Sequence, residues 1–325
     1  MNTNWDCIVV GAGAAGLSAA LVLGRARQRT LVVDAAGQSN RDAHGIGGLL
    51  GHDRRPPAEF YAGGRAELAE YPTVQLRAGE VVDGEPQGEG FVLELADGSR
   101  EVTRRVLLAT GMDYRYPPLP GIAERWGRSV FHCPFCHGWE VRDRQLAVLD
   151  RGASGVHRAL LLGAWSEDVT LLADGPAELD AEDAQRLHDA GITVDERRVA
   201  GLRGPGSTLT GVVFADGDER PCGGLLVPVT LHQRSALAQR LGAAASEEPG
   251  PIAVDALQVD QTFATSAPGV SAAGDVAATM PSVANAIASG NAAAAMLVGA
   301  LRTAPQRPTA ALRRPAATGA EAGAR

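Results

Sequence analysis

Residues 6–16 read D-C-I-V-V-G-A-G-A-A-G, a short apolar run that passes directly into a glycine-rich turn. Together with the apolar helical pattern of residues 17–24, this stretch predicts a strand, a tight turn and a helix. A second apolar run, residues 30–33, ends at Asp34, which lies 18 residues after the last glycine of the turn. A strand, a G-x-G-x-x-G turn, a helix and an acid about 20 residues further on are typical of a dinucleotide-binding unit.

The same arrangement returns in mid-chain. Residues 145–174 contain an apolar run, the stretch R-G-A-S-G-V-H-R-A-L-L-L and a second apolar run that ends before Asp174. Near the C-terminus an apolar strand ends at Gly274 and Asp275, and an Ala-rich helix covers about residues 282–301. The sequence therefore predicts an α/β fold with two Rossmann-like domains.

The composition excludes several classes of protein. The chain has 325 residues, 45% of them apolar, which is about two domains' worth of sequence. All 30 basic residues are arginine, so enzymes that need a lysine, such as P-loop and pyridoxal-phosphate enzymes, are excluded. A formal net charge of −8 without a basic cluster argues against nucleic acid as a partner. No run reaches the roughly 18 uninterrupted apolar residues of a membrane span, so we expect a cytoplasmic protein without membrane contact.

Two of the four cysteines form a pair. Cys133 and Cys136 make a C-x-x-C, whereas Cys7 lies in an apolar strand and Cys222 in a Pro/Gly turn, as packed thiols do. A C-x-x-C at the start of a helix favours thiolates and a small redox-active disulfide. The flanking His132 and His137 make a zinc site the alternative, but no second ligand pair exists in the sequence, so we expect no metal.

Five motifs then occur in one order: the glycine turn with Asp34, L-L-A-T-G at 107–111, C-P-F-C at 133–136, the altered second turn and A-A-G-D-V at 272–276. Together they resemble the low-molecular-weight thioredoxin reductases over about residues 5–300. The string C-P-F-C-H-G-W-E at 133–140 is closest to a branch that includes FAD-dependent dithiol oxidases, which close disulfides in holomycin-like and gliotoxin-like natural products.

The resemblance implies two domains, the second inserted in the first, and a homodimer. The Pro/Gly-rich stretches 116–121 and 246–251 fit as the hinges. The implied parts are a discontinuous FAD-binding domain at 1–117 plus 247–302, a pyridine-nucleotide-type domain at 118–246 that carries the C-x-x-C, and a disordered tail at 303–325.

The resemblance also implies the cofactor FAD and its contacts. The glycine turn would hold the pyrophosphate, Asp34 the adenosine ribose and Asp275 a ribityl hydroxyl, and the start of the last helix would stabilise negative charge on the reduced ring. Asn40 and Arg41 either lie near the ring or face solvent. The implied FAD-binding residues are Gly11, Gly13, Ala14, Ala15, Gly16, Asp34, Ala35, Asn40, Arg41, Thr110, Gly111, Gly274, Asp275, Ser282, Val283 and Ala284.

The implied catalytic residues are Cys133, Cys136 and His137. By the family pattern Cys136 would be the thiol beside the flavin and Cys133 the thiol that meets the substrate. His137 stands where the reductases carry an acid/base Asp, and it is either a proton carrier or a packing residue.

The second nucleotide turn departs from the family. It reads Asp150-x-Gly152-x-x-Gly155, so that an aspartate replaces the first glycine beside the place of a pyrophosphate. No basic run follows the second strand, where Asp174 would favour NADH over NADPH. NAD(P)H is therefore a doubtful cofactor, and we expect that the domain is retained as a scaffold.

Three functional hypotheses follow. The first is a dithiol oxidase that passes electrons from a small dithiol to O₂ or another acceptor. The second is an NAD(P)H-dependent reductase of a thioredoxin-like protein or a small disulfide, and the third is a non-catalytic flavin-bound redox sensor. The sequence fixes neither the substrate nor the roles of His44 and His52 in the loop at 42–53.

Overall fold

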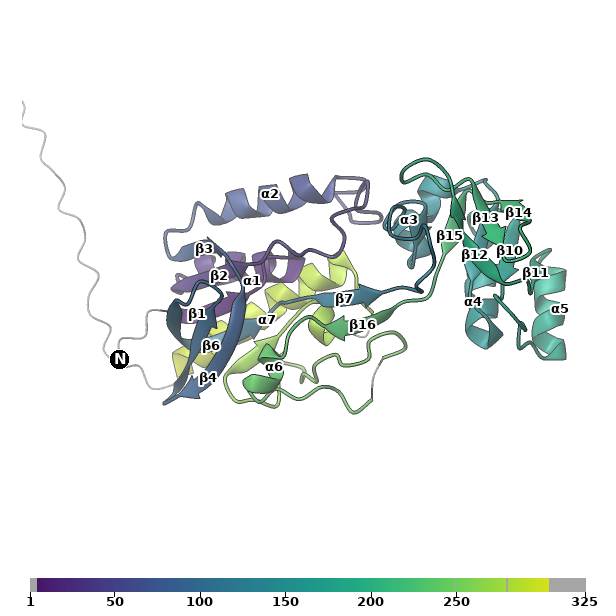
Figure 1. Ribbon diagram of the computed structural model, residues 1–325. Helices are drawn as coiled ribbons and strands as arrows, with labels where there is room; N and C mark the ends of the chain where they lie inside the picture. The colour runs from purple at the N-terminus through teal and green to yellow at the C-terminus, as the bar shows by residue number, and fades with distance from the viewer. Residues whose placement is uncertain (1–4, 249, 279, 304–325) are drawn as a thin grey trace, which may run out of the picture.

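The computed structural model describes residues 5–248, 250–278 and 280–303. The chain forms two bodies that are joined by a narrow ribbon of two strands (Figure 1). The larger body contains both ends of the described chain, and the smaller is built from the middle of it. Each body has a parallel-rich sheet, which confirms the predicted α/β class with two Rossmann-like domains.

The larger body is organised around a seven-stranded sheet of order β3-β2-β1-β6-β5-β4, with β17 also paired to β6. The strands β3, β2, β1, β6 and β17 are parallel, whereas β5 and β4 continue the sheet as an antiparallel hairpin. Its strands are β1 (Trp5–Val10), β2 (Thr30–Asp34), β3 (Val74–Ala78), β4 (Val81–Gln87), β5 (Gly90–Leu95), β6 (Arg100–Leu108) and β17 (Val270–Ala272).

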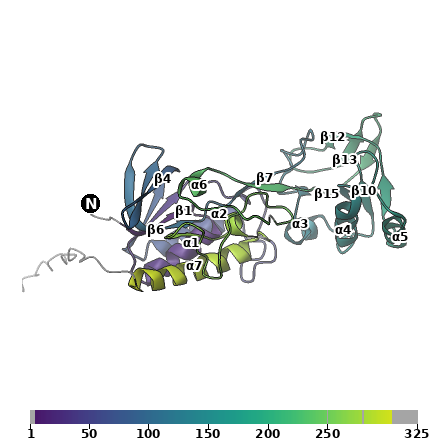
Figure 2. The ribbon, with the colours of Figure 1, turned by 90° about the horizontal axis from the view of Figure 1, so that it is seen from below.

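Side chains alternate between the two faces of this sheet, as the period of a strand requires. In β1, Cys7 and Val9 pack under the helices, whereas Ile8 and Val10 point to the opposite core. The helical face is covered by α1 (Ala14–Arg25), α2 (Pro57–Leu68) and α7 (Val283–Thr303), and the opposite core includes the short helix α6 (Leu237–Arg240). Figure 2 shows α1 and α7 side by side along this sheet.

The smaller body has three layers. A five-stranded sheet of order β11-β10-β9-β15-β8 lies between a layer of helices, α3, α4 and α5, and a three-stranded sheet, β12-β13-β14. Its elements are β8 (Val130–Phe131), α3 (Pro134–Val141), β9 (Leu146–Leu149), α4 (Gly152–Leu162), β10 (Val169–Leu172), α5 (Ala181–Asp189), β11 (Thr193–Asp195), β12 (Val199–Arg203), β13 (Gly211–Phe214), β14 (Glu219–Pro221) and β15 (Gly224–Leu226).

The ribbon between the bodies consists of β7 (Met112–Arg115) and β16 (Thr230–Gln233), which are antiparallel. The chain leaves the larger body through β7 and returns through β16 (Figure 1). Val227 packs in the smaller body, but Val229 and Leu231 already pack in the larger one. The structure therefore places the return crossing near residue 228 and not at the hinge expected at 246–251.

The last helix, α7, is long and apolar enough to cross a membrane by length and composition, with 21 residues and a mean hydropathy of 1.4. In the structure one side of it packs against α1 as a core helix. Gly290 makes the closest contact, since a Cβ there would lie 2.1 Å from the carbonyl oxygen of Ala15. The helix includes Thr303, which the sequence assigned to the tail. The rest of the expected disordered tail, 304–325, lies outside the described residues.

This contact predicts that Gly290→Ala destabilises the protein by about 3 kcal/mol, because the added methyl group forces two closely packed backbones apart. Gly299→Ala is the matched control on the same helix, where a Cβ would meet no atom within 4 Å. That substitution should stabilise the helix by about 0.5–1 kcal/mol, since alanine is the better helix former. Urea unfolding of both variants measures the difference, and equal stabilities would contradict the packing argument.

Candidate active site

One cavity of about 540 Å³ lies where the two bodies meet, a size within the roughly 300–1,000 Å³ typical of cofactor and small-molecule sites. It is lined by the β1–α1 turn, the end of β6, the start of α7 and the C-x-x-C. These segments are far apart in the sequence. The fold therefore brings together the dinucleotide turn and the cysteine pair.

The glycine turn is shaped for a close approach by a ligand. Gly11 has φ +107°, and a Cβ there would lie 2.2 Å from the carbonyl oxygen of Ala109, so that no other residue fits. A Cβ on Gly13 would meet no atom within 4 Å, so this backbone faces the cavity without a covering side chain. The first N–H groups of α1 begin here, and helix N–H groups without intrahelical partners bind phosphate well.

Almost all the residues expected to contact FAD lie on this cavity. Two do not. Gly16 packs behind the turn, where a Cβ would be 1.8 Å from the carbonyl oxygen of Gly11. Arg41 lies outside the lining because its guanidinium donates to the carbonyl of Ala36, at 2.6 Å. The residues on the lining are Gly11, Gly13, Ala14, Ala15, Asp34, Ala35, Asn40, Thr110, Gly111, Gly274, Asp275, Ser282, Val283 and Ala284.

The polar residues of this set are held in place by neighbours. Asp34 accepts the backbone N–H of Ala36 at 2.8 Å and lies 3.8 Å from the guanidinium of Arg65. Asn40 accepts the hydroxyl of Tyr61 at 2.9 Å. The carboxylate of Asp34 is thus an oriented hydrogen-bond acceptor on the cavity wall, and the oxygen of Asn40 is already used by Tyr61.

Asp275 also lies on the cavity lining, in the segment that precedes α7. Burial raises the pKa of its carboxyl group, and the hydroxyl of Tyr114 donates to it at 2.9 Å. Ser282 caps α7 by accepting the backbone N–H of Asn285 at 3.1 Å. Among the described residues, the preceding N–H groups of this turn, from Val283 and Ala284, have no hydrogen-bond acceptor, and the dipole of the helix favours negative charge beside them.

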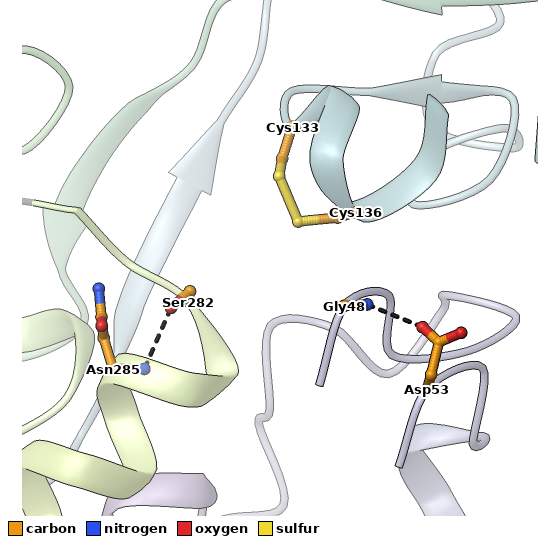
Figure 3. The surroundings of a disulfide bond; sticks show 6 residues. All are labelled: Gly48, Asp53, Cys133, Cys136, Ser282 and Asn285. Carbon is orange, nitrogen blue, oxygen red and sulfur yellow. Dashed lines mark hydrogen bonds between the residues drawn. A yellow bond between two sulfur atoms is a disulfide. The ribbon is translucent and has the colours of Figure 1, made fainter. Parts of the chain in front are cut away.

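Cys133 and Cys136 form a disulfide at the start of α3, with 5.4 Å between their Cα atoms. In Figure 3 the disulfide lies across from the first turn of α7, and the loop that carries Gly48 and Asp53 also lies below the disulfide, to the right of that turn. Both cysteines line the cavity. The predicted thiol pair at a helix start is therefore placed at the dinucleotide site.

The loop at 42–48 docks on the smaller body. A Cβ on Gly47 would lie 2.7 Å from the carbonyl oxygen of Cys136, so the loop backbone touches the disulfide helix. Nε of Arg128 donates to the carbonyl of Asp42 at 2.9 Å, and the guanidinium lies 3.4 Å from Nε2 of His44. His44 thus contacts Arg128 and not the disulfide. His52 lies with its Nδ1 3.2 Å from Arg55.

His137 lies in the first turns of α3, directly after Cys136. Its ring stacks on Phe131 with the ring centres 5.7 Å apart, and within the described part of the chain neither ring nitrogen has a hydrogen-bond partner. Burial lowers the pKa of His137, and the nearby carbonyl groups of Cys133 and Gly127 offset part of this. A neutral imidazole with both nitrogens unpaired beside a disulfide is able to take up a proton.

The sequence did not predict that His132 lines the cavity. It precedes Cys133, lines the cavity and packs against Tyr114 and Trp126, at 5.1 and 5.7 Å between ring centres. Burial lowers its pKa to about 4, so the ring is neutral at physiological pH. The sequence offered only its position beside a cysteine, which also fitted a metal ligand. Among the described residues no group of three or more metal-binding side chains is found.

The other two cysteines are buried thiols. Burial raises the pKa of both Cys7 and Cys222 to about 12, and Cys222 donates to the carbonyl of Gly224. Neither residue is on the cavity lining. They are packed side chains, in line with their surroundings in the sequence.

The second glycine turn has a different environment from the first. The N–H of Gly152 donates to the carbonyl of Ala177 at 2.9 Å, and the N–H of Arg151 donates to the carboxylate of Asp150 at 2.8 Å. Asp150 also pairs with Arg158. Two donors of the turn that would meet a pyrophosphate, the N–H groups of Arg151 and Gly152, are therefore used within the protein, and the charge of Asp150 has a partner that the sequence did not reveal.

These features fit FAD at the first turn. A glycine backbone open to the cavity, helix N–H groups at both ends and hydroxyl acceptors between them match a dinucleotide with a central diphosphate. The site would hold the cofactor through the cavity-lining residues named above.

Comparison with known proteins gives the same class. Residues 5–290 match the family model described as pyridine nucleotide-disulphide oxidoreductase. The chain is 32% identical to thioredoxin reductase tcpT of Claviceps purpurea over 305 residues, which covers 90% of this chain and 92% of that protein.

Two solved structures share the fold over 93% of this chain. One is an oxidoreductase from Agrobacterium tumefaciens, with a TM-score of 0.86, 35% identity and 100% of that chain covered. The other is HlmI, with a TM-score of 0.85, 36% identity and 94% of that chain covered. The matches confirm the expected class of flavoprotein, with FAD as cofactor and sulfur groups as substrates. The chain therefore belongs to the pyridine nucleotide-disulphide oxidoreductase family and is a thioredoxin-reductase-like enzyme.

Proposed function

We propose that this enzyme oxidises a small dithiol to a disulfide through Cys133 and Cys136. The observation that carries the direction of electron flow is the closed second turn, where the N–H of Gly152 is bonded to Ala177. A pyridine nucleotide would have to displace that carbonyl group. A dithiol needs only access to the disulfide at the cavity.

The exchange consists of two thiol–disulfide steps. A thiolate of the substrate attacks the sulfur of Cys133, the Cys133–Cys136 bond breaks, and Cys136 leaves as a thiolate. The second substrate thiol gives up its proton and attacks the substrate sulfur of the mixed disulfide, and Cys133 leaves as a thiolate. The substrate has then lost two electrons and two protons, and the enzyme pair is reduced.

Each of these steps has support from the chain. The N-terminus of α3 favours the thiolate of the cysteine pair, because the helix dipole stabilises negative charge there. We assign to His137 the uptake of the proton that the second substrate thiol gives up, since it lines the same cavity as the pair and, among the described residues, its ring nitrogens have no hydrogen-bond partner. The N-terminus of α7 lies across from the disulfide (Figure 3). Its helix dipole would stabilise negative charge that lies between this helix and the disulfide.

When bound, FAD supplies a two-electron acceptor that regenerates the disulfide and passes the electrons to O₂ or another oxidant. The residues of the chain would hold the cofactor and shield the reaction from water. Partly buried aromatic rings, such as Trp126 stacked on His132, would limit the access of water to the wall beside Cys133.

The second candidate is a nucleotide-dependent disulfide reductase. It is favoured by the name thioredoxin reductase given to relatives such as that of Listeria monocytogenes, which is 29% identical over 84% of this chain. In that case the turn at Asp150 and Gly152 would have to open. A cytoplasmic homodimer is compatible with both candidates.

The two candidates differ in which compound reduces the flavin. Under anaerobic conditions dithiothreitol should bleach the visible flavin absorbance orders of magnitude faster than NADPH or NADH does. Asp150→Gly should leave NADH reduction slow, because the Ala177 carbonyl still occupies the N–H of Gly152. Stopped-flow spectrophotometry measures the rates, and efficient reduction by NADPH would place the enzyme in the reductase class.

The roles of the two cysteines can be separated by a trapping experiment. In Cys136→Ser the free thiolate of Cys133 should attack an activated disulfide of a monothiol substrate analogue, release the leaving-group thiol and keep a stable mixed disulfide, since no resolving thiol remains. Cys133→Ser should form far less adduct in the same time, because the loop at Gly47 packs against the backbone of Cys136. Intact-protein mass spectrometry measures the adducts, and the reverse pattern would exchange the two roles.

The proposed role of His137 predicts a pH dependence. Its lowered pKa keeps the ring neutral near pH 7, so kcat/KM for the dithiol should fall as the pH drops through that pKa and the ring becomes protonated. His137→Phe keeps the stacking on Phe131 and should lower kcat about 100-fold and abolish this acidic limb. His52→Phe, outside the cavity, is the control. An unchanged profile in His137→Phe would make the residue a packing group.

A further inference from the structure

The cavity wall carries an unusual balance of charge. Its acidic side chains are those of Asp34, Asp42, Glu80 and Asp275. Among the described residues that line it, the only arginine is Arg234, and the chain contains no lysine. A diphosphate brings two negative charges into this wall, so a cation beside the glycine turn would add to the attraction that the helix N–H groups supply.

Arg234 is held firmly at the base of the ribbon. It directly follows β16, where Gln233 pairs with Met112 of β7. The backbone N–H of Gln233 donates to the carboxylate of Asp255 at 2.8 Å, and its side-chain amide donates to the carbonyl of the same residue at 2.6 Å. The backbone before Arg234 is thus fixed from two directions.

The guanidinium bridges two segments that flank the glycine turn. Its Nε donates to the carbonyl of Met112 at 3.0 Å, next to Gly111 at the strand end, and another N–H donates to the carbonyl of Gly37. Gln38, the neighbour of Gly37, reaches the carbonyl of Ala12 in the turn itself, at 3.4 Å. A guanidinium has five N–H donors, so three remain for an anion.

We propose that Arg234 is the cationic residue that binds the diphosphate of FAD. Arg41, which was expected either near the ring or facing solvent, lies outside the cavity lining, whereas the tertiary structure brings Arg234 onto it. The positive charge of Arg234 also offsets part of the rise in the pKa of Asp275, which places the guanidinium near that carboxyl group. The inference concerns cofactor binding and is independent of the direction of electron flow.

The first test measures release of FAD from the holoenzyme after dilution, through the gain in flavin fluorescence. Arg234→Gln should release FAD about 10- to 100-fold faster than the wild type, as expected for loss of charge-assisted hydrogen bonds. Added NaCl should speed release from the wild type and much less from the variant. Arg234→Lys should recover part of the effect, and Arg41→Gln, the matched control, should behave as the wild type.

A second measurement separates charge recognition from a structural role. ADP carries the diphosphate, and adenosine does not. After FAD has been released, Arg234→Gln should weaken competition by ADP against FAD rebinding about 10-fold or more and leave competition by adenosine unchanged. Equal losses for ADP and adenosine, a release rate within twofold of the wild type, or the same effect in Arg41→Gln would overturn the proposal. Loss of dithiol oxidation with these binding results intact would reject only the proposed function.

Discussion

The contact between the backbones of α1 and α7 determines where the site can form. Gly290 lets α7 approach the first turn of α1 so closely that a methyl group at its position would overlap the carbonyl of Ala15. The start of α7 and the start of α1 therefore open onto one cavity. Because the positive ends of two helix dipoles meet there, the larger body offers an anionic ligand two sets of N–H groups.

The local parts of this arrangement could be predicted from the sequence. The strand-turn-helix at Gly11 and Asp34 and the Ala-rich last helix follow from short patterns in which the neighbours in sequence are also neighbours in space. The return crossing could not be predicted, because residues 229–246 follow the inserted sheet in sequence but pack in the first core. Pro228 lies at the crossing, but a single proline between two apolar runs is a weaker signal than the Pro/Gly-rich stretch at 246–251 that follows the segment.

The positions of side chains that depend on tertiary contacts could not be predicted from the sequence. Arg41 lies close to Asp34 in the chain, yet its guanidinium turns to Ala36. Arg234 lies about two hundred residues from the turn, and only the pairing of β16 with β7 brings it there. The two glycine turns make the same point. From the sequence, the charge of Asp150 was expected to repel a diphosphate. In the structure Arg158, which lies further along the chain in α4, pairs with Asp150 and neutralises this charge.

The insertion of one domain into another also sets an order for folding on the ribosome. The smaller body completes its sheet with strands drawn from residues 130–226, so it can fold once that segment has emerged. The larger body must wait for β17, where Val270 pairs with Val106, and for α7 behind it. Until then the helical face of the larger sheet lacks one of its covers, and the nascent chain depends on the folded insert to keep the two halves of that domain close together.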